Sequence, residues 1–163
     1  MAKIACPHRM GILLRRSRNG LPQKPEPPKI AGILETAIYV ADLKVAQAFY
    51  GEFLGLQSML DTPRMMAFAV APGQVLLVFC RGATREDMPT AGGVVPGHHS
   101  EGPAHFAFAI TAATYDLWRE HLRRSGVAIK SEVTWPAGGR SLYFNDPDGN
   151  VLELATPGLW PNW

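Results

Sequence analysis

Two segments near the C-terminal end of the chain, 141–144 and 151–154, alternate between apolar and polar residues. The turn sequence Asp-Pro-Asp-Gly joins them. Its proline presets φ and its glycine accepts a positive φ, so the pattern predicts a β-hairpin. Leucines and a phenylalanine fall on one face of the hairpin, and Ser141, Tyr143 and Glu153 fall on the other. The carboxylate of Glu153 therefore stands in mid-strand, where it needs water, a partner or a metal.

Periods of two and of about 3.6 residues predict eight strands and two helices along the chain. Asp42 is a suitable N-cap for the first helix, and Gly55 and Gly126 follow the two helix ends. The expected order is a strand at 33–40, a helix at 43–54, strands at 56–60, 65–70 and 75–80, then a strand at 105–110, a helix at 115–125, a strand at 128–134 and the hairpin.

The two halves of this order repeat each other. A shift of 76 residues places Phe68 on Phe144 and carries the first hairpin onto the second without a gap, and a shift of 70 residues places Glu35 on His105. The chain is therefore expected to be an α+β protein of two tandem βαβββ modules. Related by a pseudo-twofold axis, the modules would form curved mixed sheets around a shared cavity, with the helices on the outside.

Glycine and proline punctuate a linker at 83–103, between modules at about 31–82 and 104–158. Both modules belong to one predicted domain, 31–163. Residues 1–30 are basic and proline-rich, and they predict an N-terminal extension outside this domain. This extension is expected to be a flexible tail or the result of a translation start assigned too far upstream, and an organelle transit peptide is the alternative.

The chain has 163 residues, 47% of them hydrophobic, which suits one domain with a sizeable core. The formal net charge is +2, with seven Lys/Arg against one acidic residue in the extension and nine against thirteen in the rest. The mildly acidic domain argues against nucleic acid binding, and no stretch approaches the ~18 apolar residues of a membrane span. Cys6 and Cys80 are expected to stay unpaired in a reducing compartment, which favours a cytoplasmic protein.

The positions nearest the pseudo-twofold axis are equivalent in pairs, 35 with 105 and 77 with 153. Three of them carry side chains able to bind a metal, Glu35, His105 and Glu153, and the fourth is Leu77. This constellation is more specific than any single residue within it. The alternatives stay open: Glu153 would pair with Arg140 or lie in a solvated groove, and His105 would be a hydrogen-bonded core histidine.

Three stretches carry a family resemblance: residues 35–50 with Leu54-Gly-Leu56, then His105-Phe-Ala-Phe, then Asp146-Pro-Asp-Gly-Asn-Val-Leu-Glu153-Leu. Over about residues 31–158 the chain resembles the vicinal oxygen chelate superfamily. This superfamily includes glyoxalase I, extradiol dioxygenases, methylmalonyl-CoA epimerase, and fosfomycin and bleomycin resistance proteins. The resemblance implies the two-module fold specifically, but it does not single out one reaction.

The resemblance also implies metal ligands on the first and last strand of each module, at positions 35, 77, 105 and 153. Members with three protein ligands often use two histidines and a glutamate. This chain has Glu35 where histidine is usual and Leu77 where glyoxalase I has a carboxylate. These departures point away from the lactoylglutathione lyase reaction in particular.

Two carboxylates and one imidazole would form a facial set that leaves up to three octahedral positions for a substrate chelating through two oxygens. The two charges balance a divalent cation. Fe2+ or Mn2+ suits this set best, and Zn2+ or Ni2+ also fits. Glu35 and Glu153 are the expected catalytic residues, and Glu35 would act as a general base if it were not a ligand.

Further side chains are expected near the cavity, with plain packing as the alternative for each. The candidate substrate-binding residues are Tyr39, Trp135, Ser141 and Tyr143. His98 and His99 lie in the linker; either both are solvated, or one of them closes over the site as an acid–base group.

The expected function is that of a divalent-metal-dependent enzyme, a lyase, isomerase or dioxygenase, acting on a small oxygen-rich molecule. The alternative is a metal-free protein that binds a small molecule, as bleomycin resistance proteins do. A homodimer is expected. The sequence leaves open whether modules of one chain or of two chains build the cavity; in the second case, Glu35 would meet His105 and Glu153 of a neighbouring chain.

Overall fold

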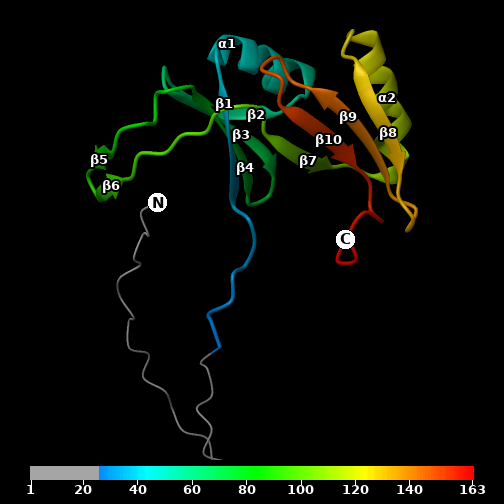
Figure 1. Ribbon diagram of the computed structural model, residues 1–163, viewed down its shortest axis with the longest axis horizontal. Coiled ribbons are helices and arrows are strands. Elements are labelled where there is room, and N and C mark those ends of the chain that lie inside the picture. The colour runs from blue at the N-terminus through cyan, green and yellow to red at the C-terminus, as the bar shows by residue number, and fades with distance from the viewer. Residues whose placement is uncertain (1–25) are drawn as a thin grey trace, which may run out of the picture. The chain divides into compact units, whose positions relative to one another are not determined.

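The computed structural model describes residues 26–163. Residues 1–25, which hold most of the predicted extension together with Cys6, lie outside the described residues. The globular unit runs from Ile33 to Trp163, and two four-stranded sheets form its framework (Figure 1). No helix within the described part is long and apolar enough to cross a membrane.

The first module forms one mixed sheet, with a helical segment between its first two strands. The sheet order is β1-β4-β3-β2, in which β1 is parallel to β4 and the other neighbours are antiparallel. Asp42 caps the helical segment as predicted, because its carboxylate accepts the N–H groups of Lys44 and Val45. The elements are β1 (Glu35–Val40), α1 (Leu43–Ala46), η1 (Gln47–Phe53), β2 (Gln57–Asp61), β3 (Met65–Ala71) and β4 (Gln74–Cys80).

The second module repeats this order in a second mixed sheet, β7-β10-β9-β8, in which β7 runs parallel to β10. Its elements are β7 (His105–Ala109), η2 (Ala112–Thr114), α2 (Tyr115–Arg124), β8 (Ile129–Thr134), β9 (Arg140–Asn145) and β10 (Val151–Ala155). The two βαβββ modules predicted from the internal repeat are confirmed. Across the described residues the two sheets stay separate and form no closed barrel.

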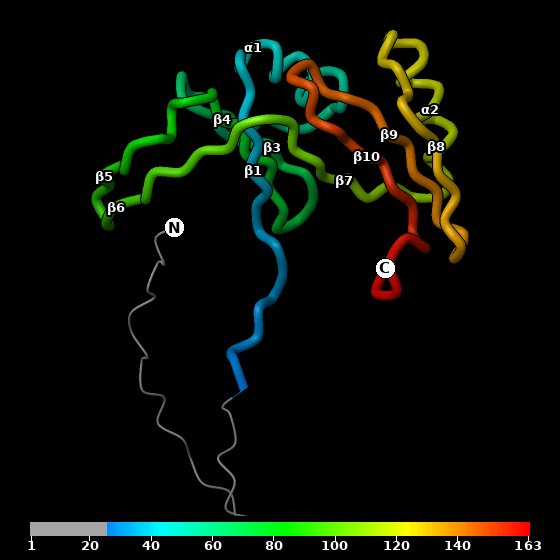
Figure 2. Tube along the Cα trace, viewed as in Figure 1, coloured from blue at the N-terminus to red at the C-terminus, as the bar shows by residue number. Residues whose placement is uncertain are grey.

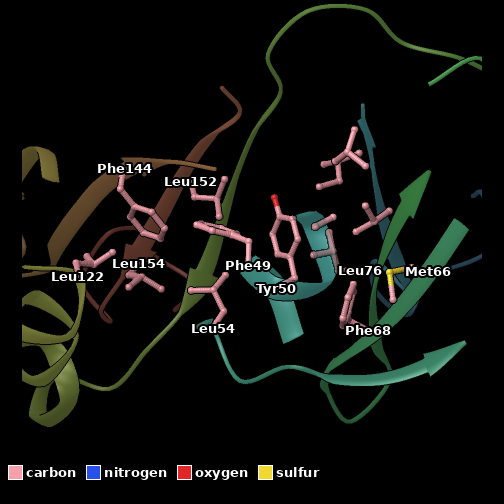
Figure 3. Close-up of a cluster of buried hydrophobic side chains, with 14 of the residues drawn as sticks. Phe49, Tyr50, Leu54, Met66, Phe68, Leu76, Leu122, Phe144, Leu152 and Leu154 are labelled. Atoms are coloured by element: carbon pink, nitrogen blue, oxygen red, sulfur yellow. The ribbon is translucent and has the colours of Figure 1, made fainter. Parts of the chain in front are cut away.

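The first predicted helix begins and ends close to the expected residues, but most of it is a π-helix rather than an α-helix. The N–H of Leu54 donates to the carbonyl of Phe49, five residues back, at 2.9 Å. The rings of Phe49 and Phe144 lie 6.5 Å apart, and those of Tyr50 and Phe68 lie 6.0 Å apart (Figure 3). The wide turn thus lets two consecutive aromatic residues pack against different sheets.

The linker predicted at 83–103 contains a short hairpin that the sequence pattern did not predict. Its strands are β5 (Met88–Thr90) and β6 (Gly93–Val95), and Figure 2 shows the chain passing through them between β4 and β7. The Gly-Gly pair at the turn is also typical of flexible linkers. Here Gly93 has a φ of 148°, a value that other residues rarely adopt, and the pair closes the hairpin.

One hydrophobic core joins the two modules. The apolar face of the second hairpin is buried as predicted, with Leu142, Phe144 and Leu152 at 0% exposure. The π-helix η1 lies between the two sheets and adds Phe49 and Tyr50 to this core (Figure 3). Burying a side chain of this size contributes about 1.5–3 kcal/mol. The shared core therefore fixes both sheets against η1.

A hydrogen bond within the core ties the turn of the second hairpin to η1. Tyr50 donates its hydroxyl to Asp146 Oδ2 at 2.7 Å, and the same carboxylate accepts the backbone N–H groups of Asp148 and Asn150. Burial and the Asp146 carboxylate raise the pKa of the Tyr50 phenol above its usual range. Asp148 pairs with Arg81 of the first module at 2.9 Å. Both modules therefore hold this turn in place.

Candidate functional site

Five of the predicted site residues lie together on the second sheet, on the face that points away from the core. Strand alternation selects them, since they are out of phase with the buried leucines of β9 and β10. The ladder places Glu153 of β10 opposite Tyr143 of β9. The five residues are His105 on β7, Trp135 after β8, Ser141 and Tyr143 on β9, and Glu153 on β10.

His105 has one ring nitrogen fixed by the backbone. Its Nδ1 lies 3.0 Å from the carbonyl oxygen of Val151, and because a carbonyl can only accept, Nδ1 carries the hydrogen. The other nitrogen, Nε2, lies 3.5 Å from Glu153 Oε2. The imidazole is 53% exposed and the carboxylate side chain only 5%. The pair thus presents an accessible nitrogen beside a buried oxygen.

The second oxygen of Glu153 is already engaged. Ser141 donates its hydroxyl to Glu153 Oε1, and the Trp135 indole N–H donates to Ser141 Oγ at 2.8 Å. Ser141 is 0% exposed and Glu153 is 4% exposed. One carboxylate oxygen of Glu153, Oε1, therefore has a hydrogen-bond donor, and the other, Oε2, faces His105.

Tyr143 lies beside both of these residues. Its ring stacks on the imidazole of His105, with centroids 6.1 Å apart and planes at 28°. Burial, followed by the neighbouring Glu153 carboxylate, raises the pKa of the Tyr143 phenol. The phenol is therefore a neutral hydrogen-bond donor at physiological pH.

His105 Nε2 and Glu153 Oε2 are both atoms that can bind a metal ion. With the hydrogen on Nδ1, a neutral imidazole keeps its lone pair on Nε2, which lies 3.5 Å from the carboxylate oxygen. A metal ion bound by both atoms would place a positive charge between the lone pair and the carboxylate. A histidine whose other nitrogen donates to a carbonyl is typical of metal ligands in proteins.

Glu35 stands at the equivalent place in the first sheet. It pairs with Val75 of β4 as His105 pairs with Val151 of β10. It is exposed and, with residues of β7, lines a cavity of about 210 Å³. In the part of the chain that the structure describes, no three His, Cys, Asp or Glu side chains gather closely enough to hold a metal ion. One chain thus brings His105 and Glu153 together, but not Glu35.

Leu77 takes the place in the first sheet that Glu153 takes in the second. Leu77 lies opposite Ala67 on the neighbouring antiparallel strand, as Glu153 lies opposite Tyr143. The equivalence of positions 77 and 153, inferred from the sequence repeat, therefore holds in the ladder. The first sheet has an apolar residue where the second has its buried carboxylate.

His98 of the linker contacts the first sheet, through residues that no pattern in the sequence predicted as its partners. Its Nδ1 lies 2.5 Å from the Tyr39 hydroxyl, and its ring meets the edge of Phe79 at 4.9 Å. Its backbone N–H donates to the carbonyl of Thr84, and its carbonyl accepts the Thr84 hydroxyl. Tyr39 lies on the same face of β1 as Glu35, so His98 covers part of this face.

The sequence of residues 32–154 matches the family described as the Glyoxalase/Bleomycin resistance protein/Dioxygenase superfamily. The chain belongs to this superfamily. The match spans both modules and every strand that carries Glu35, His105 or Glu153, and it agrees with the resemblance deduced from the sequence.

Solved structures of similar proteins share the fold of this glyoxalase-superfamily chain. It is 31% identical to a lactoylglutathione lyase from Agrobacterium tumefaciens, with a TM-score of 0.74 over 83% of this chain and 99% of that chain. A glyoxalase/bleomycin resistance protein/dioxygenase from Nocardioides is 25% identical, with a TM-score of 0.62 over 83% and 90%. A fosfomycin resistance protein from Listeria monocytogenes is 23% identical, with a TM-score of 0.58 over 80% and 97%, and shows the fold alone.

Proposed function

We propose that this protein is a divalent-metal-dependent enzyme that binds a small oxygen-rich molecule on its second sheet. The observation that carries the proposal is the pairing of His105 Nε2 with Glu153 Oε2 at 3.5 Å, with Nδ1 held by Val151. Both side chains are oriented by bonds that leave one ligand atom each for a metal. Membership of the glyoxalase superfamily supports the same chemistry.

The proposed third ligand is Glu35 from a second copy of the chain. Within one chain the two sheets share their apolar faces through η1, and no three metal-capable side chains gather among the described residues. Glu35 and His105 are both exposed and remain accessible to another module. The cavity predicted between two sheets would then form between the first sheet of one chain and the second sheet of its partner in a homodimer.

The donor set fits a hard divalent cation. Two carboxylates and one imidazole favour Fe2+ or Mn2+ and also accommodate Zn2+ or Ni2+. When bound, the metal would supply Lewis-acid stabilisation of negative charge on substrate oxygens. The neutral Tyr143 phenol would donate a hydrogen bond to a substrate oxygen. Lyase, isomerase and dioxygenase reactions all suit this arrangement, and the superfamily includes such enzymes.

Metal analysis of the full-length protein, purified without added metal, tests this proposal. We expect about one divalent ion per chain, because each proposed site uses one His105–Glu153 pair. His105→Ala should weaken metal affinity by more than about 100-fold, since a lost ligand costs more than a lost supporting hydrogen bond. His99→Ala is the matched control, because His99 is exposed. Wild-type protein without metal, and without thermal stabilisation by added Mn2+, Fe2+, Ni2+ or Zn2+, would contradict the proposal.

The second candidate function is metal-free binding of a small molecule. One observation favours it: a single chain collects only two metal-capable side chains at the site among the described residues. The Ser141 hydroxyl would then satisfy one oxygen of Glu153 in the absence of a metal. The same metal analysis separates the two candidates, because this one predicts metal-free protein whose fold and stability do not respond to metals.

A further inference from the structure

We propose that Trp135 and Ser141 are positioning residues that hold one oxygen of Glu153 and leave the other as a single ligand atom. This inference rests on the proposed metal site and explains how one of its ligands, Glu153, is oriented. It assigns to Trp135 and Ser141 a role different from the substrate contact expected from strand alternation. The relay runs from the Trp135 indole through the Ser141 hydroxyl to Glu153 Oε1.

The direction of the relay follows from the chemistry of its groups. An indole N–H can only donate, so Ser141 Oγ accepts from Trp135. The single hydroxyl hydrogen of Ser141 is then available for Glu153, which as a carboxylate can only accept. Both hydrogen bonds thus point the same way, toward the negative charge, and each strengthens the other.

Burial makes the relay specific to Glu153 rather than to a substrate. Ser141 is 0% exposed, and its hydroxyl already has one donor and one acceptor partner. A substrate on the face of the sheet would meet His105 and Tyr143 before it met this hydroxyl. With Oε1 engaged and Oε2 at 3.5 Å from His105 Nε2, the carboxylate would bind a metal through Oε2 alone.

The first module lacks the hydroxyl of the relay as well as the carboxylate. At the shift of 76 residues, which relates the two hairpins, Met65 and Leu77 stand where Ser141 and Glu153 stand in the second module. The ladder confirms the match, since Met65 pairs with Phe79 as Ser141 pairs with Ala155. The same sheet therefore forms without these polar groups. Hydroxyl and carboxylate occur together, as expected if the first serves the second.

Metal affinity of two variants tests the relay. Metal dissociation constants of the full-length protein are measured by chelator competition with Mn2+ and Zn2+. Ser141→Ala should weaken affinity by about 10–100-fold, the usual effect of losing a partner that orients a metal ligand. Trp135→Phe, which keeps an aromatic ring but removes the N–H, should weaken it in the same direction by a smaller factor. The matched controls, which should bind as the wild type does, are Ser125→Ala at the exposed end of α2 and Trp160→Phe in the exposed C-terminal turn.

A second readout is tryptophan fluorescence. Because Trp135 is linked to Glu153 through one hydroxyl, metal binding should change the emission of wild-type protein, and Trp135→Phe should abolish most of this change while Trp160→Phe keeps it. If Ser141→Ala does not fold, Trp135→Phe still decides the question, because its side chain is only partly buried.

The outcomes distinguish the relay from the metal site itself. Wild-type protein that binds no metal overturns both the proposed function and the relay. Wild-type protein that binds metal, with unchanged affinity in Ser141→Ala and Trp135→Phe, overturns the relay alone. A lower melting temperature with unchanged metal affinity also overturns it, because the two residues would then only support the sheet.

Discussion

At the scale of single residues, two tyrosines that lie next to carboxylates show how burial changes the pKa of a phenol. Tyr50 donates to the buried Asp146 and joins η1 to the turn of the second hairpin. Tyr143 lies beside Glu153 on the open face of the second sheet. Burial and the adjacent carboxylate raise the pKa of both phenols. The first phenol thus joins two elements of the fold, while the second lies at the proposed site.

Tyr50→Phe should lower the free energy of unfolding by about 1 kcal/mol near neutral pH, since Asp146 keeps its other donors. The folded-state pKa of Tyr50 is raised, so its contribution is fully present below the unfolded pKa of about 10 and is lost as pH rises above it. Urea denaturation at about pH 8 and about pH 10.5 measures this. The difference in the free energy of unfolding between wild type and variant should shrink at the higher pH. A difference that grows would contradict a raised pKa of Tyr50 in the folded state.

At the scale of elements, the sequence predicted the framework because each strand follows a simple alternation. The repeat predicted both sheets, and the alternation of β9 and β10 placed Ser141, Tyr143 and Glu153 on one face. The π-helix η1 was not predictable from periodicity, since apolar residues at helical spacing do not distinguish a π-helix from an α-helix. The hairpin β5–β6 was missed because its glycines are equally typical of a linker.

His98 should hold the linker against the first sheet through Tyr39 and Phe79. His98→Ala and Tyr39→Phe are therefore expected to speed tryptic cleavage after Arg85 severalfold, because the linker would detach more often. His99→Ala, which changes an exposed neighbour, should cleave at the wild-type rate. Limited proteolysis with mass spectrometry of the fragments measures this. Equal rates in all four proteins would show that the Tyr39–His98 contact does not restrain the linker.

At the scale of the whole molecule, one chain supplies only part of the proposed site. His105 and Glu153 form a pair on the second sheet while Glu35 stands on the first, and no three metal-capable side chains gather among the described residues. Sequence alone could pair position 35 with 105 and position 77 with 153, but it could not tell whether Glu35, His105 and Glu153 meet within one chain. That depends on how the two modules are arranged in space, which no local pattern encodes.

The proposed pairing of two chains can be tested by mixing two variants that each lack one proposed metal ligand. If the site is shared, Glu35→Ala and His105→Ala chains each bind metal poorly alone, but a mixed dimer has one intact site. That site takes Glu35 from the His105→Ala chain, and His105 and Glu153 from the Glu35→Ala chain. After the two variants are unfolded together and refolded at equal concentration, about one quarter of the wild-type metal sites should return, because half of the dimers are mixed and each holds one intact site of two.

The measurement that most directly tests the account is therefore the metal content of this refolded mixture, compared with each variant refolded alone. The account predicts metal binding in the mixture well above that of either variant, together with a dimer by mass in solution. A mixture that binds no more metal than the two variants separately, while refolded wild-type chain regains its full metal content, would contradict a site shared between chains.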